Sequence, residues 1–205
     1  MKLVLFGGTF DPIHMGHLLL AEYCREQVDA DRIIFMPAGI PPHKKGQRRT
    51  PGSIRAEMLE LAVHGNPAFE VDRFEIDRTE VSYTVDTLRH LSEKHPDAEL
   101  FFLVGADMLF DLPNWYRGEE ICRLATPIAA QRPGSPPPDF GCLAPIVPDP
   151  SRRREISQHL LDMPRIDLSS TNIRQRVEEG RSIRYQTPRD VELHIHSEQL
   201  YKKGQ

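Results

Sequence analysis

The feature that most constrains the fold is a pair of strand-like runs, near the start of the chain, that are apolar on both faces. These runs are KLVLF at residues 2–6 and DRIIFMPAG at residues 31–39, and the helical segment MGHLLLAEYCREQV at residues 15–28 separates them. Strands that are apolar on both faces are typical of a parallel sheet covered by helices on each side. The chain is therefore expected to contain a buried parallel sheet.

The alternation of strands and helices continues along the chain. On the helical pattern that starts at residue 53, Ile54, Met58, Leu61 and Ala62 share one face, and Gly65 ends the pattern. The later strand-like runs occupy residues 99–107 and 126–131, and the helical patterns occupy residues 53–65, 84–96, 114–125, 169–180 and 187–201.

This order predicts an α/β fold with a doubly wound (Rossmann-like) parallel sheet and helices on both faces. A length of 205 residues is that of one ordinary α/β domain, so we expect a single domain over residues 1–205. The proline-rich residues 133–150 are expected to form an irregular surface segment. In such a fold, ligands bind outside the carboxyl ends of the strands.

Charge and cysteine content exclude several classes of protein. A net charge of -4 argues against general nucleic-acid binding, because such domains usually carry a basic excess. Cys24, Cys122 and Cys142 lack metal-type spacing, which favours reduced thiols in the cytoplasm. No apolar run is long enough to span a membrane, so we expect a soluble protein. His194 and His196 diverge on a helix, so no metal site is expected.

The turn between the first strand and the first helix carries the strongest functional signal, GGTFDPIHMGH at residues 7–17. The dinucleotide-binding pattern GxGxxG is absent. Glycines allow a ligand to approach the backbone, and a helix start attracts phosphate. His14 and His17 lie three residues apart and can point into one crevice. The alternative is that one histidine caps the helix and the other packs.

Two motifs carry a resemblance to a known superfamily. GGTFDPIHMGH resembles the T/HxGH signature of nucleotidyltransferases, in which both histidines contact nucleotide phosphates. LSSTNIR at residues 168–174 resembles their ISSTxIR motif, with Leu168 in place of isoleucine. Hydroxyls at that helix start and the forked cation of Arg174 can hold phosphate oxygens. The alternative is an ordinary capped helix with a surface arginine.

Three further stretches, MPAGIPPHKK, SYTVDTL and VGADMLFDLPNWY, together resemble the bacterial nicotinate-nucleotide adenylyltransferases. The resemblance covers nearly the whole chain. It implies the transfer of the adenylyl group of ATP to nicotinate mononucleotide, forming nicotinate adenine dinucleotide and pyrophosphate in NAD biosynthesis. The implied catalytic residues are His14, His17, Lys44 and Arg174. The expected ATP-binding residues are Gly8, Thr9, Phe10, His14, His17, Gly105, Asp107, Ser170, Thr171 and Arg174.

The mononucleotide is expected to contact a second group of residues. The resemblance implies that Trp115 stacks on the pyridine ring, although a lone tryptophan is by default a core residue. With Asn114 as a helix cap, residues 115–117 would form a first helical turn whose free amides suit a carboxylate. The expected mononucleotide-binding residues are Lys44, Thr84, Trp115 and Tyr116.

The attacking group in this reaction is itself a phosphate, so no strong general base is required. Mg²⁺ is expected to bridge the ATP phosphates and to take most of its ligands from phosphates and water, since no acidic cluster is apparent. Two alternatives stay open, namely another adenylyl or cytidylyl transferase of the superfamily and a noncatalytic nucleotide sensor. The sequence also leaves open whether the chain forms a homo-oligomer.

Overall fold

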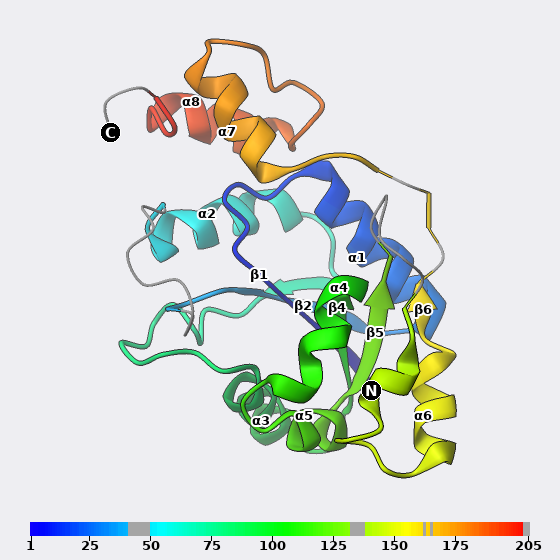
Figure 1. The fold of residues 1–205 in the computed structure, drawn as a ribbon. Coiled ribbons are helices and arrows are strands. Elements are labelled where there is room, and N and C mark those ends of the chain that lie inside the picture. The colour runs from blue at the N-terminus through cyan, green and yellow to red at the C-terminus, as the bar shows by residue number, and fades with distance from the viewer. Residues whose placement is uncertain (41–49, 132–137, 162, 165, 203–205) are drawn as a thin grey trace.

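The computed structural model describes residues 1–40, 50–131, 138–161, 163–164 and 166–202, and Figure 1 shows their arrangement. The strands are β1 (Lys2–Gly8), β2 (Arg32–Pro37), β3 (Phe69–Val71), β4 (Glu99–Gly105), β5 (Thr126–Ala130) and β6 (Leu160–Leu161). The α-helices are α1 (Met15–Val28), α2 (Gly52–Val63), α3 (Thr84–Lys94), α4 (Ala106–Asp111), α5 (Gly118–Leu124), α6 (Pro150–Ser157), α7 (Ser170–Glu178) and α8 (Arg189–Ser197). Two short 3-10 helices are η1 (Leu112–Asn114) and η2 (Phe140–Leu143).

The strands form one sheet in the order β3-β2-β1-β4-β5-β6, and every pair of neighbouring strands is parallel. The chain runs outward from β1 to β3, returns to the centre and continues from β4 to β6. The strand order therefore reverses between β1 and β4, which is where a doubly wound sheet opens a crevice at its carboxyl end. The predicted α/β class is confirmed.

Alternate side chains of the central strand enter two separate cores. Val4 and Phe6 pack with α1, α2, α7 and α8, whereas Leu3 and Leu5 pack with α3, α4, α5 and α6. In Figure 1, α2, α7 and α8 lie above the sheet, and α3, α5 and α6 lie below it, so we call the first core the upper core and the second the lower core. Because full burial of one such side chain stabilises the fold by about 1.5–3 kcal/mol, both layers contribute to holding the sheet.

The helix expected at residues 114–125 begins later than predicted, at Gly118. Asn114 is not its cap, because it ends η1, and Trp115 continues as extended backbone with ψ 148°. The actual N-cap is Arg117, with φ 55°, and a Cβ on Gly118 would lie 2.6 Å from the carbonyl oxygen of Leu112. This close packing fixes the helix start at a glycine. The prediction that residues 115–117 form a first helical turn was wrong.

Other differences concern burial and short elements. On α2, Leu61 is 37% exposed, whereas Arg55 and Leu59 are buried, so the predicted apolar face was partly wrong. Four short elements, β3, β6, α4 and α6, were not predicted from the sequence. Part of the proline-rich stretch, residues 132–137, lies outside the described residues. Within the rest, η2 is capped by Asp139, whose carboxylate accepts a hydrogen bond from the Gly141 amide at 2.8 Å.

Candidate active site

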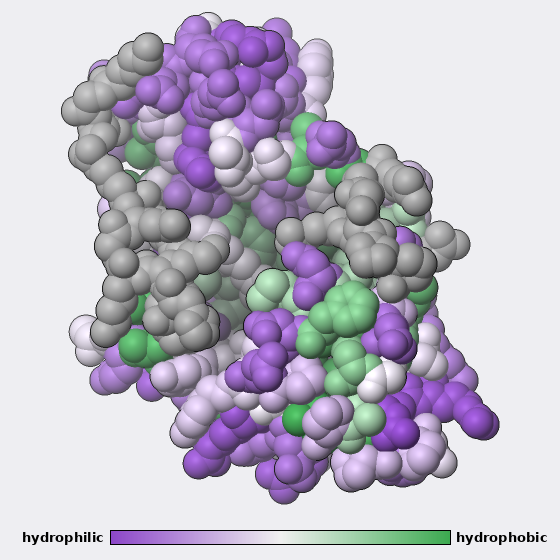
Figure 2. Space-filling view, in the orientation of Figure 1, coloured by the Kyte–Doolittle hydropathy of each residue, from purple (hydrophilic) through white to green (hydrophobic). Residues whose placement is uncertain are grey.

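Two of the segments predicted to bind ATP lie at the same end of the sheet. The loop that follows β1 leads to His14, and β4 ends at Gly105, two residues before Asp107 in the first turn of α4. Because β1 and β4 are neighbours at the reversal of strand order, both segments border the expected crevice. Figure 2 shows this face hollowed beneath the C-terminal helices α7 and α8.

Phe10 shapes the loop between β1 and α1. Its φ is 48°, an uncommon value for a residue with a bulky side chain, and its ring is 2% exposed. The ring meets His17 edge-on, with 5.1 Å between centroids, and a Cβ on Gly8 would lie 2.8 Å from it. Gly8 is therefore needed for close packing, and the Phe10 side chain supports His17 from the core.

His14 and His17 form one unit at the start of α1. Their rings stack with 3.6 Å between centroids and an interplanar angle of 23°. The backbone N–H of His14, the N-cap residue, donates to Nδ1 of His17 at 3.2 Å. An accepting Nδ1 places the proton of a neutral His17 ring on Nε2. The loop thus fixes both the orientation and the tautomer of His17.

His14 is 6% exposed, and burial lowers its pKa from 6.5 to about 4. The ring is therefore neutral near pH 7. A neutral imidazole can bind a phosphate group by donating a hydrogen bond from its N–H. A positively charged imidazole in this buried position would need a nearby negative charge. The geometry favours hydrogen bonding by His14 over charge pairing.

The structure brings the start of α7 next to this histidine loop. Ser169 caps α7 by accepting a hydrogen bond from the Asn172 amide at 3.2 Å. The Ser170 hydroxyl donates to the carbonyl oxygen of Pro12 at 2.8 Å. Arg174 donates to the carbonyl oxygen of Asp11 at 2.7 Å and to the hydroxyl of Thr171 at 3.3 Å. Residues of the two sequence motifs are thus joined directly by hydrogen bonds.

Two of the residues expected to bind the mononucleotide, Thr84 and Tyr116, lie at or beside the start of α3. Thr84 is the first residue of that helix, and Tyr83 is its N-cap. The ring of the exposed Tyr116 lies 4.6 Å from that of Tyr83. Trp115 is half-buried, and its ring lies 5.9 Å from that of Phe102. Tyr116 therefore contacts the N-cap of the helix that begins at Thr84, while Trp115 packs against the lower core.

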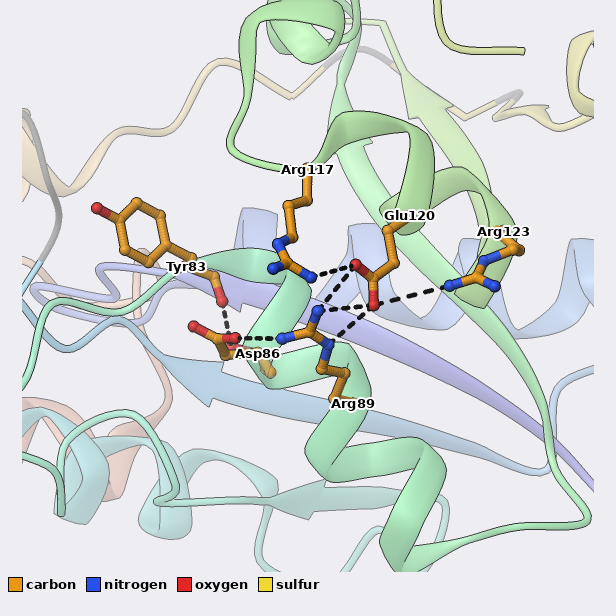
Figure 3. A network of polar contacts seen from close by, with 7 residues as sticks. Tyr83, Asp86, Arg89, Arg117, Glu120 and Arg123 are labelled. Atoms are coloured by element: carbon orange, nitrogen blue, oxygen red, sulfur yellow. Dashed lines mark hydrogen bonds and ion pairs between the residues drawn. The ribbon is translucent and has the colours of Figure 1, made fainter. Parts of the chain in front are cut away.

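An ion-pair network joins Arg117 and Glu120, at the start of α5, to Arg89 on α3, as Figure 3 shows. Glu120 accepts two hydrogen bonds from Arg89, at 2.9 and 2.8 Å, and one from Arg117 at 3.1 Å. Arg89 also donates to Asp86, in the first turn of α3, at 3.1 Å. The hydrogen bonds from Arg89 are the main cause of a lowered pKa of Glu120. The bidentate pairing gives this contact a defined geometry.

The buried Arg55 on α2 was not predicted from the sequence. Arg55 is 4% exposed and donates to the carbonyl oxygens of Thr9 at 2.7 Å, Ala38 at 2.8 Å and Thr50 at 3.0 Å. It thereby joins the chain after β1 to the chain after β2. The available signal was an arginine in a strongly apolar helical segment, directly beside Ile54.

Glu75 joins the segment after β2 to α3 by two hydrogen bonds. Its carboxylate accepts hydrogen bonds from the Gly39 amide at 3.2 Å and from the Thr87 hydroxyl at 2.7 Å. Burial raises the pKa of Glu75. A Cβ on Gly39 would lie 2.3 Å from the Glu75 carbonyl oxygen, so the position requires glycine. Glu75 therefore connects the end of β2 to α3.

Lys44 lies outside the described residues. Among the residues that the structure does describe, no group of three histidine, cysteine or carboxylate side chains could hold a metal ion. In the same part of the chain, no helix has the length and apolar character needed to cross a membrane. Cys24, Cys122 and Cys142 are all free thiols.

Comparison with known families gives a match along most of the chain. Residues 5–176 match the model of the cytidylyltransferase-like family. A protein of Thermomicrobium roseum called a probable nicotinate-nucleotide adenylyltransferase is 45% identical over 98% of this chain and 92% of its own length. A protein of Thermus thermophilus with the same name is 44% identical over 98% of this chain and 100% of its own length.

Solved structures share the fold at lower identity. One is described as Plasmodium falciparum nicotinic acid mononucleotide adenylyltransferase complexed with NaAD. It aligns with a TM-score of 0.74 over 98% of this chain and 97% of its own, at 18% sequence identity. A putative nicotinate-nucleotide adenylyltransferase from Vibrio parahaemolyticus aligns with a TM-score of 0.67 at 21% identity, over 99% of this chain and 97% of its own.

Proposed function

The chain belongs to the nicotinate-nucleotide adenylyltransferases of the cytidylyltransferase-like family, and we propose that its histidine loop and α7 start form the site of adenylyl transfer. The reaction joins ATP and nicotinate mononucleotide into nicotinate adenine dinucleotide with release of pyrophosphate, a step of NAD biosynthesis. The observation that carries the assignment is the stacked His14–His17 pair at a helix start beside Arg174.

Catalysis rests on alignment and on stabilisation of charge. The mononucleotide phosphate is largely ionised at neutral pH and attacks the α-phosphorus of ATP without a general base. Negative charge then builds on the α-phosphate oxygens and on the departing pyrophosphate. His17 donates through Nε2 to the α-phosphate, and His14, Lys44 and Arg174 donate to the surrounding phosphate oxygens.

Mg²⁺ supplies further neutralisation of the ATP phosphates. If Mg²⁺ binds together with ATP, phosphate oxygens and water would give it most of its ligands, because the described part of the chain offers no group of three suitable side chains. On the nucleoside side, the backbone of Gly8, Thr9, Phe10 and Gly105 leaves room for ATP, and Asp107 accepts hydrogen bonds from the ribose hydroxyls.

The mononucleotide binds beside the start of α3. The first turn of this 11-residue helix, rather than that of α5, offers its amides to the nicotinate carboxylate, and the Thr84 hydroxyl adds a donor. Trp115 and Tyr116 form the aromatic side of this subsite. Aromatic stacking does not distinguish an acid from an amide, so the helix amides carry that selectivity.

The chain works as one nucleotidyltransferase domain over residues 1–205, in the cytoplasm. The support for one domain is that α7 and α8 pack on the same core as α1 and α2. The support for the cytoplasm is the presence of three free thiols, which suit a reducing compartment.

A substrate panel tests the function. Pyrophosphate release is measured with ATP and Mg²⁺ against nicotinate mononucleotide, nicotinamide mononucleotide and phosphopantetheine. We expect the highest kcat/KM with the nicotinate substrate. Turnover of phosphopantetheine alone would point to another transferase of the superfamily. ATP binding without any pyrophosphate release would instead favour a nucleotide sensor.

The preference for acid over amide has its own test. Trp115→Ala should raise KM for both mononucleotides by a similar factor of about 5 to 30, because the cation-π contact is worth about 1 to 2 kcal/mol for either ring. Phe110→Ala, an exposed aromatic residue on α4, is the control and should leave both values unchanged. If the wild-type enzyme had the same kcat/KM for nicotinate and nicotinamide mononucleotide, the assignment of the nicotinate carboxylate to the α3 amides would be wrong.

A further inference from the structure

Side chains from the C-terminal region donate hydrogen bonds to three consecutive backbone carbonyl groups of the loop that precedes His14. The donors come from α7 and from the segment before α8, and the acceptors lie about 160 to 170 residues earlier in the chain. The contacts are Arg174 to Asp11 at 2.7 Å, Ser170 to Pro12 at 2.8 Å and Thr187 to Ile13 at 2.9 Å.

The loop and the first residue of α1 make two more hydrogen bonds with the C-terminal region. The amide of Met15 donates to the carbonyl oxygen of Gln186 at 2.9 Å. The carboxylate of Asp11, which is 6% exposed, accepts a hydrogen bond from the Tyr201 hydroxyl at 2.7 Å and from the Thr50 amide at 3.3 Å. Figure 1 shows α7 and α8 lying over the loop between β1 and α1.

These contacts matter because the loop is buried and irregular. Asp11, Pro12 and Ile13 are all buried, and a buried carbonyl without a partner is costly. A loop with this conformation cannot satisfy its carbonyls as a strand or helix does. The C-terminal side chains therefore supply the hydrogen bonds that secondary structure supplies elsewhere.

We propose that Tyr201 and Thr187 are positioning residues, which fix the Asp11–Ile13 backbone and thereby the catalytic placement of His14 and His17. The proposal rests on the adenylyl transfer assigned above. Neither residue belongs to the motifs that identify the site. They act through the loop and touch neither substrate.

The backbone at Tyr201 supports a specific role for its side chain. Its φ is 63°, a value that favours glycine, yet a tyrosine stands there. Its ring packs against the core to which α2 and α8 contribute, and its hydroxyl donates a hydrogen bond to the Asp11 carboxylate. Burial, followed by the nearby Asp11 carboxylate, raises the pKa of Tyr201. The hydroxyl thus stays a donor over the working range of pH.

The sharpest test removes only the hydroxyl. Tyr201→Phe should lower kcat by about threefold to tenfold, the scale of one lost hydrogen bond, while KM for nicotinate mononucleotide changes by less than about twofold. Tyr185→Phe is the matched control, because Tyr185 lies in the same region but is 86% exposed. All variants are assayed at a temperature where circular dichroism shows them folded.

Thr187 provides an independent second variant. Thr187→Val keeps the shape but removes the hydroxyl and should lower kcat in the same way, whereas Thr187→Ser should restore it. Parent-like kcat in both Tyr201→Phe and Thr187→Val would overturn the proposal. A kcat loss in Thr187→Val that serine does not restore would also contradict it, because the effect would then belong to packing.

Hydrogen exchange distinguishes failure of this inference from failure of the proposed function. Tyr201→Phe should speed amide exchange in peptides covering residues 9–18 and leave peptides from β5 unchanged, whatever reaction the enzyme catalyses. Unchanged exchange at residues 9–18 would refute the anchoring itself. A double-mutant cycle with Asp11→Asn should give non-additive losses of kcat, and additive losses would show that the two residues do not act together.

Discussion

At the scale of single residues, His14 links the site to the stability of the fold. Burial lowers its pKa from 6.5 to about 4, so the folded state resists protonation that the unfolded chain accepts. The resulting stability is fully present above pH 6.5 and is lost as pH falls toward 4. At 1.36 kcal/mol for each pKa unit, this contribution is about 3 kcal/mol.

Urea unfolding at pH 7.5 and pH 4.5 checks this expectation. The parent should lose more free energy of unfolding between the two conditions than His14→Gln does, by about 2 to 3 kcal/mol. Exposed His64, whose substitution to glutamine should not change the difference, serves as the control. An identical loss in the parent and in His14→Gln would show that His14 does not titrate in this way.

His17 is expected to act mainly on the transition state. Replacing it with alanine should lower kcat by about two to three orders of magnitude, the usual cost of losing one preorganised donor, with a smaller change in ATP affinity. Steady-state kinetics and ATP titration of the variant measure both quantities, and His64→Ala is the matched control. A variant with the parent's kcat would refute the role of His17.

Residues in short motifs could be predicted from sequence, whereas residues that act through the fold could not. The spacing of His14 and His17 already placed them on one side of a helix start. Arg55 and Tyr201 gave no comparable signal, because their partners are backbone carbonyls or a carboxylate far away in the chain. Only the folded structure brings those partners together.

At the scale of elements, long apolar strands and helices were predictable and short ones were not. β1, β2, β4 and β5 are nearly continuous apolar runs because both of their faces are buried. β3 has only three residues, all of them half-buried, and therefore carries no such pattern. The start of α5 was mispredicted because local capping preference favoured Asn114, whereas packing of Gly118 against Leu112 decided the outcome.

The contact between α3 and α5 yields a prediction at this scale. Glu120→Gln removes the charge that both Arg89 and Arg117 contact, so the segment carrying Tyr116 should lose its fixed position relative to α3. KM should rise by about threefold to tenfold for nicotinate mononucleotide and stay unchanged for ATP.

The control for this prediction is Glu155→Gln, which removes one partner of the Arg152–Glu155 pair on α6. That pair lies away from the Tyr83–Tyr116 contact, so both KM values should match those of the parent. A rise of KM for ATP in Glu120→Gln would mean that the network supports the whole site rather than the mononucleotide side.

At the scale of the whole molecule, the sequence predicted the layers of helices and sheet. It did not predict that the C-terminal region packs on the loop after β1. The doubly wound sheet followed from strands that are apolar on both faces. The return of the C-terminal region onto the first loop depends on single hydrogen bonds between segments far apart in sequence, such as Thr187 to Ile13. Periodicity carries no information about such contacts.

The proposal of a single domain predicts one cooperative unfolding transition. Trp115, the only tryptophan, packs in the lower core, whereas α7 and α8 pack in the upper one. Tryptophan fluorescence therefore reports the lower layer, and far-ultraviolet circular dichroism reports the helices of both layers. If the layers unfold together, the two probes should give the same Tm.

ATP extends this test, because a ligand that binds only the folded chain stabilises everything that unfolds with its site. At about one hundred times its Kd, ATP with Mg²⁺ should add about 2.7 kcal/mol. For a chain of this size, that corresponds to a rise in Tm of about 5 to 10 °C. Since the proposed site joins the upper helices to the central sheet, both probes should shift by the same amount. A shift confined to circular dichroism would mean that the C-terminal helices unfold separately from the layer around Trp115.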